Sequence, residues 1–331
     1  MPAEWEHHDA TWLSWPKDPL TFPPAIIEDV ENIFVKMIEA LCEGERVNVL
    51  VNDEDSKRKL MRKVNAEKNL NIVKLKYSDV WVRDYGPIFV KNKEGSVAAT
   101  KWIFNAWGEK YDELKLDNQT GLEIARSICN LVFEPGIVLE GGSIDVNGKG
   151  SCLTTTQCLL NKNRNPNLSR NEISRYLEEY LGITNLIWLS SGIEGDDTDG
   201  HVDDLARFVS EDTVICMVED DKSSPNYAAL NENYELLKSS KDEKGNYLKV
   251  IPIRMPRMIS AEEVQLPASY ANFYIGNSCV LVPTFGGERD NLALSTLRSF
   301  FPDRKLIGIN CEQLVYGFGG IHCVTQQQPG A

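Results

Sequence analysis

Five segments of the chain place a carboxylate, an imidazole or a thiol beside glycine at the end of an apolar run. They are Trp81–Pro87, Leu139–Ser143, Asp196–Asp204, Phe285–Asn291 and Gly317–Pro329. Glycine frees the backbone at such strand ends, where side chains from separate strands can converge. We therefore expect these segments to contribute to a common site.

Cys323 and His201 supply the reactive groups of this expected site. Cys323 has glycine and polar neighbours, unlike the other seven cysteines, so it suits a nucleophile, although a buried structural thiol is the usual role of cysteine. His201 lies between Asp199 and Asp203, whose charges would raise its pKa toward the range of a general acid–base. A solvated loop histidine is the alternative.

Carboxylates supply the remaining groups. Asp84 directly follows Arg83, so a local ion pair is its alternative role. Glu140 stands between an apolar run and two glycines, where a buried carboxylate needs a partner. Six acidic residues fall between Glu194 and Asp204, and such crowding is costly unless a cation offsets it. Together, the carboxylates, the histidine and the thiol indicate a nucleophilic site that binds a cation.

A guanidinium group fits this set of side chains. It is planar and permanently charged, and its paired N–H donors match carboxylates. Two carboxylates could hold its plane against a thiolate, which the bound cation would stabilise. An imidazole could then protonate the departing ammonia and activate the water that follows.

Two other segments resemble ligand-binding motifs, but their spacing does not fit those motifs. The segment 197–200 resembles part of a calcium loop, but taking Gly200 as the sixth position leaves no ligand at the first and twelfth. Gly317 and Gly319 imitate a dinucleotide-binding turn, but His322 replaces the third glycine and too little chain follows for a helix. We expect neither calcium nor a dinucleotide to bind.

Composition narrows the class of protein. The chain has 331 residues and a formal net charge of -14, which disfavours nucleic acid and favours cationic or neutral small partners. We expect one catalytic domain over residues 1–331, since no linker divides the chain. Its first residues show no secretory signal and no apolar run spans a membrane, so we expect a cytoplasmic protein with reduced thiols. Four histidines argue against a structural zinc site.

The elements that must position these groups recur in a regular order. Apolar runs predict strands at 47–51, 72–75, 97–104, 136–146, 151–160, 186–189, 213–218, 250–253, 270–282 and 305–310. Helical periodicity and capping signals predict helices at 24–42, 53–68, 119–133, 169–182, 226–239 and 288–300. The order strand, turn, strand, helix, strand repeats about five times, unlike the strict alternation of a doubly wound sheet.

Five ordered motifs resemble those of the agmatine deiminase (agmatine iminohydrolase) family. They are the opening MPAEWEHHDATWLSWP, then WVRDYGP, LEGGSI, DGHVDD and GGIHCVTQQQP. That family belongs to the guanidine-modifying superfamily with the pentein fold, and it is grouped with bacterial peptidyl-arginine deiminases. The resemblance extends from one end of the chain to the other.

The resemblance implies an α/β pentein fold, with five strand–helix repeats around a pseudo-fivefold axis. It also implies hydrolysis of agmatine to N-carbamoylputrescine and ammonia, in polyamine (putrescine) biosynthesis, without metal or organic cofactor. We expect this reaction to pass through a covalent cysteine alkylthiouronium intermediate. The sequence does not determine the oligomeric state, and a homo-oligomer is among the states considered.

The resemblance also assigns roles to individual residues. Cys323 falls on the family's nucleophile, His201 on its general acid–base, and Glu140 on the carboxylate that hydrogen-bonds and orients this histidine. Three further positions fall on residues near the substrate, namely the guanidinium-binding Asp84 and Asp203 and the aromatic Trp81.

Three positions beside these residues depart from the family's usual pattern. The segment before the nucleophile commonly reads Gly-Gly-Gly-Asn-Ile-His, whereas here Phe318 stands at its second position and glycine at its fourth. Tyr85 stands where many members have threonine. These changes could alter substrate fit while leaving the reaction type intact.

Two alternative functions stay open. One is deimination of free arginine or of a C-terminal arginine in a peptide, and the other is guanidinium binding without catalysis. An arginine substrate would need a basic anchor for its carboxylate, for which Arg83, Arg207 and Arg289 are candidates. The acidic segments 196–199 and 288–290 instead favour the second cation of agmatine.

Overall fold

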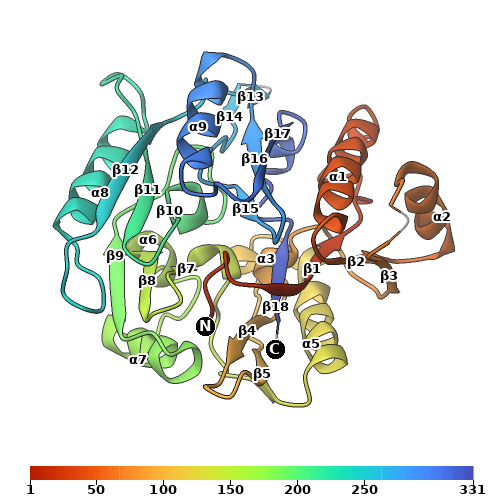
Figure 1. Cartoon of the computed structure of the whole chain (residues 1–331), viewed down its shortest axis with the longest axis horizontal. Coiled ribbons are helices and arrows are strands. Elements are labelled where there is room, and N and C mark those ends of the chain that lie inside the picture. Colours follow the sequence, from red (N-terminus) through yellow and green to blue (C-terminus); the bar gives the residue numbers. More distant parts are fainter. Residues whose placement is uncertain (67, 262, 331) are drawn as a thin grey trace.

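The computed structural model describes residues 1–66, 68–261 and 263–330. Its larger sheets form five units that succeed one another around the centre of the molecule, with the long helices on the outside (Figure 1). In each unit the first strand pairs antiparallel with the second, and the second pairs parallel with the third. A helix connects the two parallel strands, as such a crossover requires.

Four of the units are continuous along the chain. The second unit contains β4 (Ile88–Lys91), β5 (Val97–Thr100), α5 (Leu116–Ile128) and β6 (Val132–Phe133). The third contains β7 (Asp145–Val146), β8 (Ser151–Thr155), α7 (Arg170–Leu181) and β9 (Asn185–Leu189). The fourth contains β10 (Ala206–Phe208), β11 (Thr213–Val218), α8 (Tyr227–Ser239) and β12 (Lys249–Arg254). The fifth contains β15 (Tyr274–Ile275), β16 (Cys279–Thr284), α9 (Glu288–Arg298) and β17 (Lys305–Asn310).

The first unit is built from both ends of the chain. It contains β18 (Gln326–Pro329), β1 (His8–Ser14), α1 (Ile27–Cys42) and β2 (Arg46–Val51), and α2 (Glu54–Lys63) leads to an additional parallel strand, β3 (Leu70–Lys74). Trp12 is paired with Gln326 in this sheet, and the two ends lie close together in Figure 1. The C-terminal segment therefore completes the ring of units.

Short helices and one small hairpin occupy the connections. They are α3 (Val82–Tyr85), α4 (Ala106–Glu109), α6 (Thr156–Leu159), η1 (Asp112–Leu114), η2 (Gly141–Ser143), η3 (Val202–Asp204), η4 (Val315–Gly317), β13 (Ser260–Ala261) and β14 (Val264–Gln265). None of the described helices has the length and apolar character that crossing a membrane would demand.

The expected order of elements is confirmed, and α7 shows how local chemistry sets an element's bounds. Ser169 and Glu172 form the predicted capping box, and Gly182 ends the helix in the left-handed conformation, with φ 71°. Both capping residues were identified from the sequence. The helix therefore begins and ends where its capping residues require.

Several predicted boundaries are wrong. The run 136–146 forms a strand only at its last two residues, because its other residues lead into the buried η2 turn at the centre of the molecule. Residues 151–160 change from β8 to α6, and the predicted helix 119–133 ends at Ile128 before β6. β1 and β18 were not predicted. The apolar character of these runs reflects burial, which does not by itself distinguish a strand from a buried turn.

Candidate functional site

The residues of the candidate site lie at corresponding places in the five units, each just before the first strand of its unit. Because the units repeat around one centre, these places face a common region (Figure 1). The residues are Asp84 before β4, Glu140 before β7, His201 and Asp203 before β10, Asn272 before β15, and Cys323 before β18.

Cys323 lies between η4 and β18, and its side chain is buried except where it lines a pocket. Its Sγ lies 3.2 Å from Asn272 Nδ2 and 3.8 Å from Asp203 Oδ2. Burial raises the pKa of the Cys323 thiol well above its usual value, and the charges of nearby aspartates raise it further. The thiol therefore needs a cation nearby to become a thiolate at neutral pH.

Asp84 lines the pocket, and two hydrogen-bond donors hold its carboxylate. Its Oδ1 accepts a 3.0 Å hydrogen bond from Gly142 N, and its Oδ2 accepts one of 2.9 Å from Trp107 Nε1. Burial raises the pKa of the Asp84 carboxyl, the charge of His201 opposes this, and Asp203 adds to it. Arg83 does not form the local ion pair considered for Asp84, because its guanidinium turns toward Gln327 and Glu4.

Trp107 was not identified from the sequence. It adopts left-handed backbone angles, with φ 52° and ψ 46°, inside the distorted α4 turn. This conformation directs its indole N–H to Asp84, and its ring lines the pocket. The sequence signal that could have identified Trp107 is its place in an Asn-Ala-Trp-Gly segment, because such a turn tolerates unusual backbone angles.

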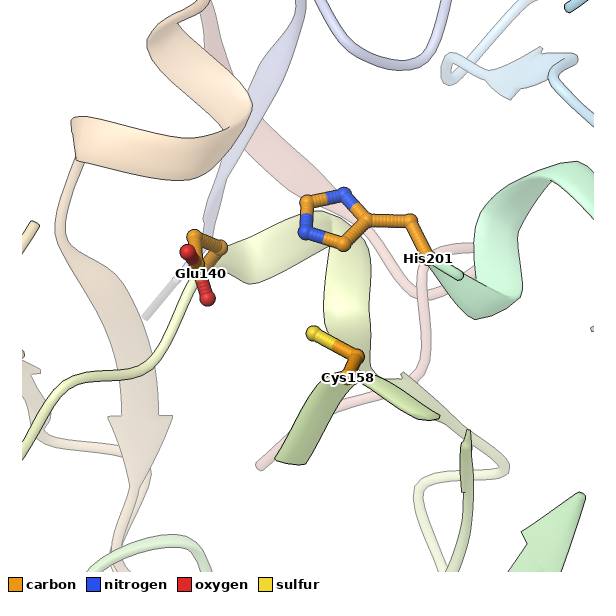
Figure 2. A group of neighbouring side chains, drawn as sticks. All are labelled: Glu140, Cys158 and His201. Atoms are coloured by element: carbon orange, nitrogen blue, oxygen red, sulfur yellow. The ribbon is translucent and has the colours of Figure 1, made fainter. Parts of the chain in front are cut away.

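His201, Glu140 and Cys158 form a buried group beside the pocket (Figure 2). One polar atom of each lies within 4.8 Å of the others. Neither ring nitrogen of His201 has a hydrogen-bond partner among the described residues, and Glu140 Oε2 also has none. The expected hydrogen bond between Glu140 and His201 is thus not formed, although the two side chains face each other (Figure 2).

Arg164 takes the other oxygen of Glu140. Its Nε donates to Glu140 Oε1 at 2.6 Å, and its Nη1 donates to Asp199 Oδ2 at 2.7 Å. Lys110 forms a second ion pair with Asp199, at 3.1 Å. These two cations offset the acidic crowding noted in this segment. The charge of Arg164 also disfavours a metal ion in the neighbouring group of Glu140, Cys158 and His201.

The charge of His201 is favoured chiefly by Asp84, which was not one of the two aspartates expected, and Asp203, which was expected, contributes less. Its Nδ1 lies 3.7 Å from Asp84 Oδ1, whereas Asp199 is engaged by Arg164. Burial lowers the pKa of His201, but the charge of Asp84 and the Cys158 thiol, followed by Asp203, outweigh burial and hold it well above its ordinary value. His201 is therefore set to carry a proton in the resting site.

The two carboxylate oxygens of Asp203 differ in their partners. Its Oδ2 accepts a 2.7 Å hydrogen bond from His322 Nδ1, and His322 Nε2 donates to Glu4 Oε2 at 2.8 Å. Asp203 Oδ1 has no partner among the described residues. Burial raises the pKa of Asp203, but the hydrogen bond from His322 and the surrounding cations outweigh it, so the pKa is lowered. Asp203 thus presents one charged, unpaired oxygen.

A pocket of about 380 Å³ opens above Cys323. Trp81 forms part of its wall, and the Trp81 indole is fixed by a 2.9 Å hydrogen bond from Nε1 to Asp79 Oδ2. Carboxylates are numerous in the lining, which includes Asp18, Asp79, Asp84, Glu113 and Asp197. Among the described residues that line it, none is a lysine or an arginine. The pocket therefore favours a cationic occupant.

The remaining candidates from the sequence lie in different places. Phe318 lines the pocket, so this departure from the family pattern bears directly on the occupant. Tyr85 is buried behind the site, where its hydroxyl bonds to Ser14 Oγ. The candidate anchors Arg83, Arg207 and Arg289 do not line the pocket, and neither do residues 288–290.

Known proteins share both the sequence and the fold of this chain. The family model described as Porphyromonas-type peptidyl-arginine deiminase matches residues 1–329. An agmatine deiminase of Stutzerimonas stutzeri is 36% identical over 352 residues, covering 99% of this chain and 95% of that protein. The solved structure of the agmatine deiminase of Enterococcus faecalis matches with a TM-score of 0.94 at 34% identity, covering 100% of this chain and 95% of the other.

A more distant structure shares the fold alone. It is SxtG, an amidinotransferase from Microseira wollei, with a TM-score of 0.57 at 9% identity, covering 100% of this chain and 96% of that one. Together with the closer matches, this likeness confirms the predicted α/β pentein fold. The resemblance found in the five sequence motifs is likewise confirmed.

Proposed function

Because the chain belongs to the Porphyromonas-type peptidyl-arginine deiminase family, it is a hydrolase acting on an amidine C–N bond, and we propose that its substrate is agmatine. The products would be N-carbamoylputrescine and ammonia, which assigns the enzyme to putrescine formation. The proposal rests on the residues around Cys323 and on the charge of the pocket above it.

The observation that carries the choice of substrate is the charge of the pocket lining. Agmatine has a guanidinium at one end and an ammonium at the other, and carboxylates can accept hydrogen bonds from both cations. Free arginine or a C-terminal arginine would bring a carboxylate into a lining whose described residues include no lysine or arginine. Arg83 and Arg207 do not serve as anchors, because both are buried and paired with Glu4.

The guanidinium would bind at the carboxylates of Asp84 and Asp203. Asp203 Oδ1 has no partner within the described chain, and Asp84 lines the pocket together with Cys323. Carboxylates match the paired N–H donors of a guanidinium, so two of them would fix its plane against the Cys323 sulfur. Trp81 would then flank the methylene chain, with the ammonium directed toward the outer carboxylates.

The bound cation would activate Cys323. It would offset the aspartate charges that keep this thiol protonated, so that the thiol proton is released to solvent. The thiolate would then attack the guanidinium carbon to form a tetrahedral adduct. His201 would donate its proton to the departing nitrogen, which leaves as ammonia, and an alkylthiouronium bound to the sulfur would remain.

Water would complete the reaction. Neutral His201 would take a proton from the attacking water, whose oxygen bonds to the same carbon. Collapse of this second adduct breaks the C–S bond and releases N-carbamoylputrescine with its new C=O group, while the hydroxyl proton of the adduct passes to the departing thiolate and restores the thiol. Glu140 faces His201 and would favour the imidazolium in both steps, while Arg164 fixes its other oxygen.

The test compares ammonia release from agmatine, arginine, methylguanidine and a peptide ending in arginine. We expect agmatine to give the highest kcat/KM, and Cys323→Ala to abolish turnover because it removes the sulfur that forms the adduct. Cys311→Ala is the matched control, since Cys311 is equally buried and lies outside the pocket lining. Acid quenching followed by mass spectrometry should find the adduct on the peptide that contains Cys323.

Other outcomes would change the assignment. A clear preference for arginine or the peptide would mean that this compound, and not agmatine, is the substrate. Binding of agmatine without ammonia release from any of the four compounds would favour a guanidinium-binding protein. Activity retained by Cys323→Ala would exclude the covalent mechanism.

A further inference from the structure

Asn272 is the residue that the fifth unit contributes to the centre of the molecule. It lies two residues before β15 and is buried, with 1% of its surface exposed. Its side-chain amide lies against the sulfur of Cys323, with Nδ2 at 3.2 Å from Sγ. No role was predicted for this residue from the sequence, because it falls within an aromatic run that was predicted to be a strand.

The surroundings of Asn272 determine which way its amide points. Nδ2 lies 2.9 Å from Asp204 Oδ1 and 3.2 Å from the Cys323 sulfur, which accepts hydrogen bonds in its thiolate form. Oδ1 faces two backbone donors, His322 N at 2.8 Å and Cys323 N at 3.4 Å. The reverse orientation would place N–H against N–H and oxygen against carboxylate. The amide is therefore fixed with a donor aimed at the sulfur.

The charges around Cys323 make such a donor important. The titratable groups near its sulfur are the carboxylates of Asp84, Asp203 and Asp204, together with the imidazoles of His201 and His322 that contact or face them. The three carboxylates all disfavour a thiolate. Among the described side chains, Asn272 provides the one neutral donor to this sulfur.

We propose that Asn272 is a catalytic residue whose Nδ2–H donates a hydrogen bond to the Cys323 thiolate. This inference rests on the proposed role of Cys323 as the nucleophile. The donor stabilises the thiolate formed when the guanidinium binds, and it does so again when the C–S bond breaks and the thiolate departs. Because the amide is held by Asp204 and by backbone N–H groups, it needs no rearrangement at either step.

The pH dependence of Cys323 alkylation tests this role without turnover. Iodoacetamide labelling is followed by mass spectrometry of the peptide that contains Cys323, over a pH series, in wild type, Asn272→Ala and Asn272→Asp. Asn272→Ala should move the profile to higher pH and slow labelling at neutral pH by about 10-fold or more. Asn272→Asp keeps the acceptor for His322 N but adds a negative charge beside the sulfur, so its profile should move further.

Asn233 supplies a matched control. It is also fully buried, and its amide bridges Ser190 N and Ser191 O, away from the pocket lining. Asn233→Ala should leave the labelling profile of Cys323 unchanged. Circular dichroism of each variant identifies any loss of fold before labelling.

Steady-state kinetics give the second measurement. Asn272→Ala should lower kcat by about 10- to 100-fold while KM changes much less, because the hydrogen bond strengthens as charge develops on the sulfur. Labelling profiles of both Asn272 variants that coincide with that of the wild type would overturn the proposal. If the wild type releases ammonia from no guanidine compound, the proposed function fails, while the labelling profile still decides the role of Asn272.

Discussion

Asp203 shows how one side chain can be both fixed and available. His322 holds Oδ2, while Oδ1 has no partner among the described residues. His322 is itself held by Glu4, which also accepts from Ile275 N at 2.9 Å. A carboxylate from the first turn of the chain thus positions a histidine next to Cys323, and this histidine positions the guanidinium-binding carboxylate.

Removal of this support should weaken substrate binding. We expect His322→Ala and Glu4→Gln to lower kcat/KM by about 10- to 100-fold, mainly through KM, because a buried hydrogen bond to a charged group is lost. His322→Asn keeps an N–H donor near the position of Nδ1, so it should recover part of the loss. Kinetics with agmatine over a range of concentrations separate KM from kcat.

His8 provides the control for this prediction. It forms a comparably buried pair with Glu45, at 3.2 Å, outside the pocket lining. His8→Ala should lower the melting temperature while leaving KM unchanged. Equal losses of kcat/KM in His8→Ala and His322→Ala would show that the effect is general destabilisation.

At the scale of elements, the site depends on turns that precede strands. The motifs were recognisable in the sequence because glycine, charge and a reactive group coincide in each of them. Trp107 and Asn272 were not recognisable, since each is a single residue whose role depends on which partner the fold brings to it. The predicted boundaries of the strand at 136–146 were wrong for a related reason, because a buried turn and a strand share the same apolar composition.

The η2 turn illustrates how closely these elements approach one another. A Cβ added at Gly142 would lie 2.6 Å from His201 Nδ1, 2.9 Å from Asp84 Oδ1 and 3.1 Å from Asp203 Oδ2. The backbone here has no room for a side chain, although Gly142 does not have a positive φ. Glycine at this position therefore brings η2 against three functional groups of neighbouring units.

We expect Gly142→Ala to lower kcat/KM by about 100-fold or more, because the added methyl group displaces the histidine and both aspartates. Gly308→Ala in β17 is the control, since it adds a methyl in a tight but remote position, 3.1 Å from Thr284 Cγ2. Both variants are compared by steady-state kinetics and thermal unfolding. Wild-type activity in Gly142→Ala would show that η2 can withdraw from the site without consequence.

At the scale of the whole molecule, the ring of units brings distant parts of the chain together. The first unit pairs β1 with β18, so the two chain ends share one sheet, which favours a single catalytic domain over residues 1–331. The order of repeats was readable from the sequence, but this closure was not. The strand that closes the ring consists of Gln326, Gln327, Gln328 and Pro329, residues that carry no strand signal.

The net charge of -14 should act on the substrate as a field around the whole molecule. Salt shortens the reach of this field from about 30 Å at 0.01 M to about 3 Å at 1 M. We therefore expect kcat/KM for doubly charged agmatine to fall several-fold across this range, with kcat nearly constant because a bound substrate is screened much less. Methylguanidine, with one charge, should show a smaller slope. Replacing sodium chloride by choline chloride separates screening from specific ion binding, and equal slopes for both substrates would mean that the field does not contribute.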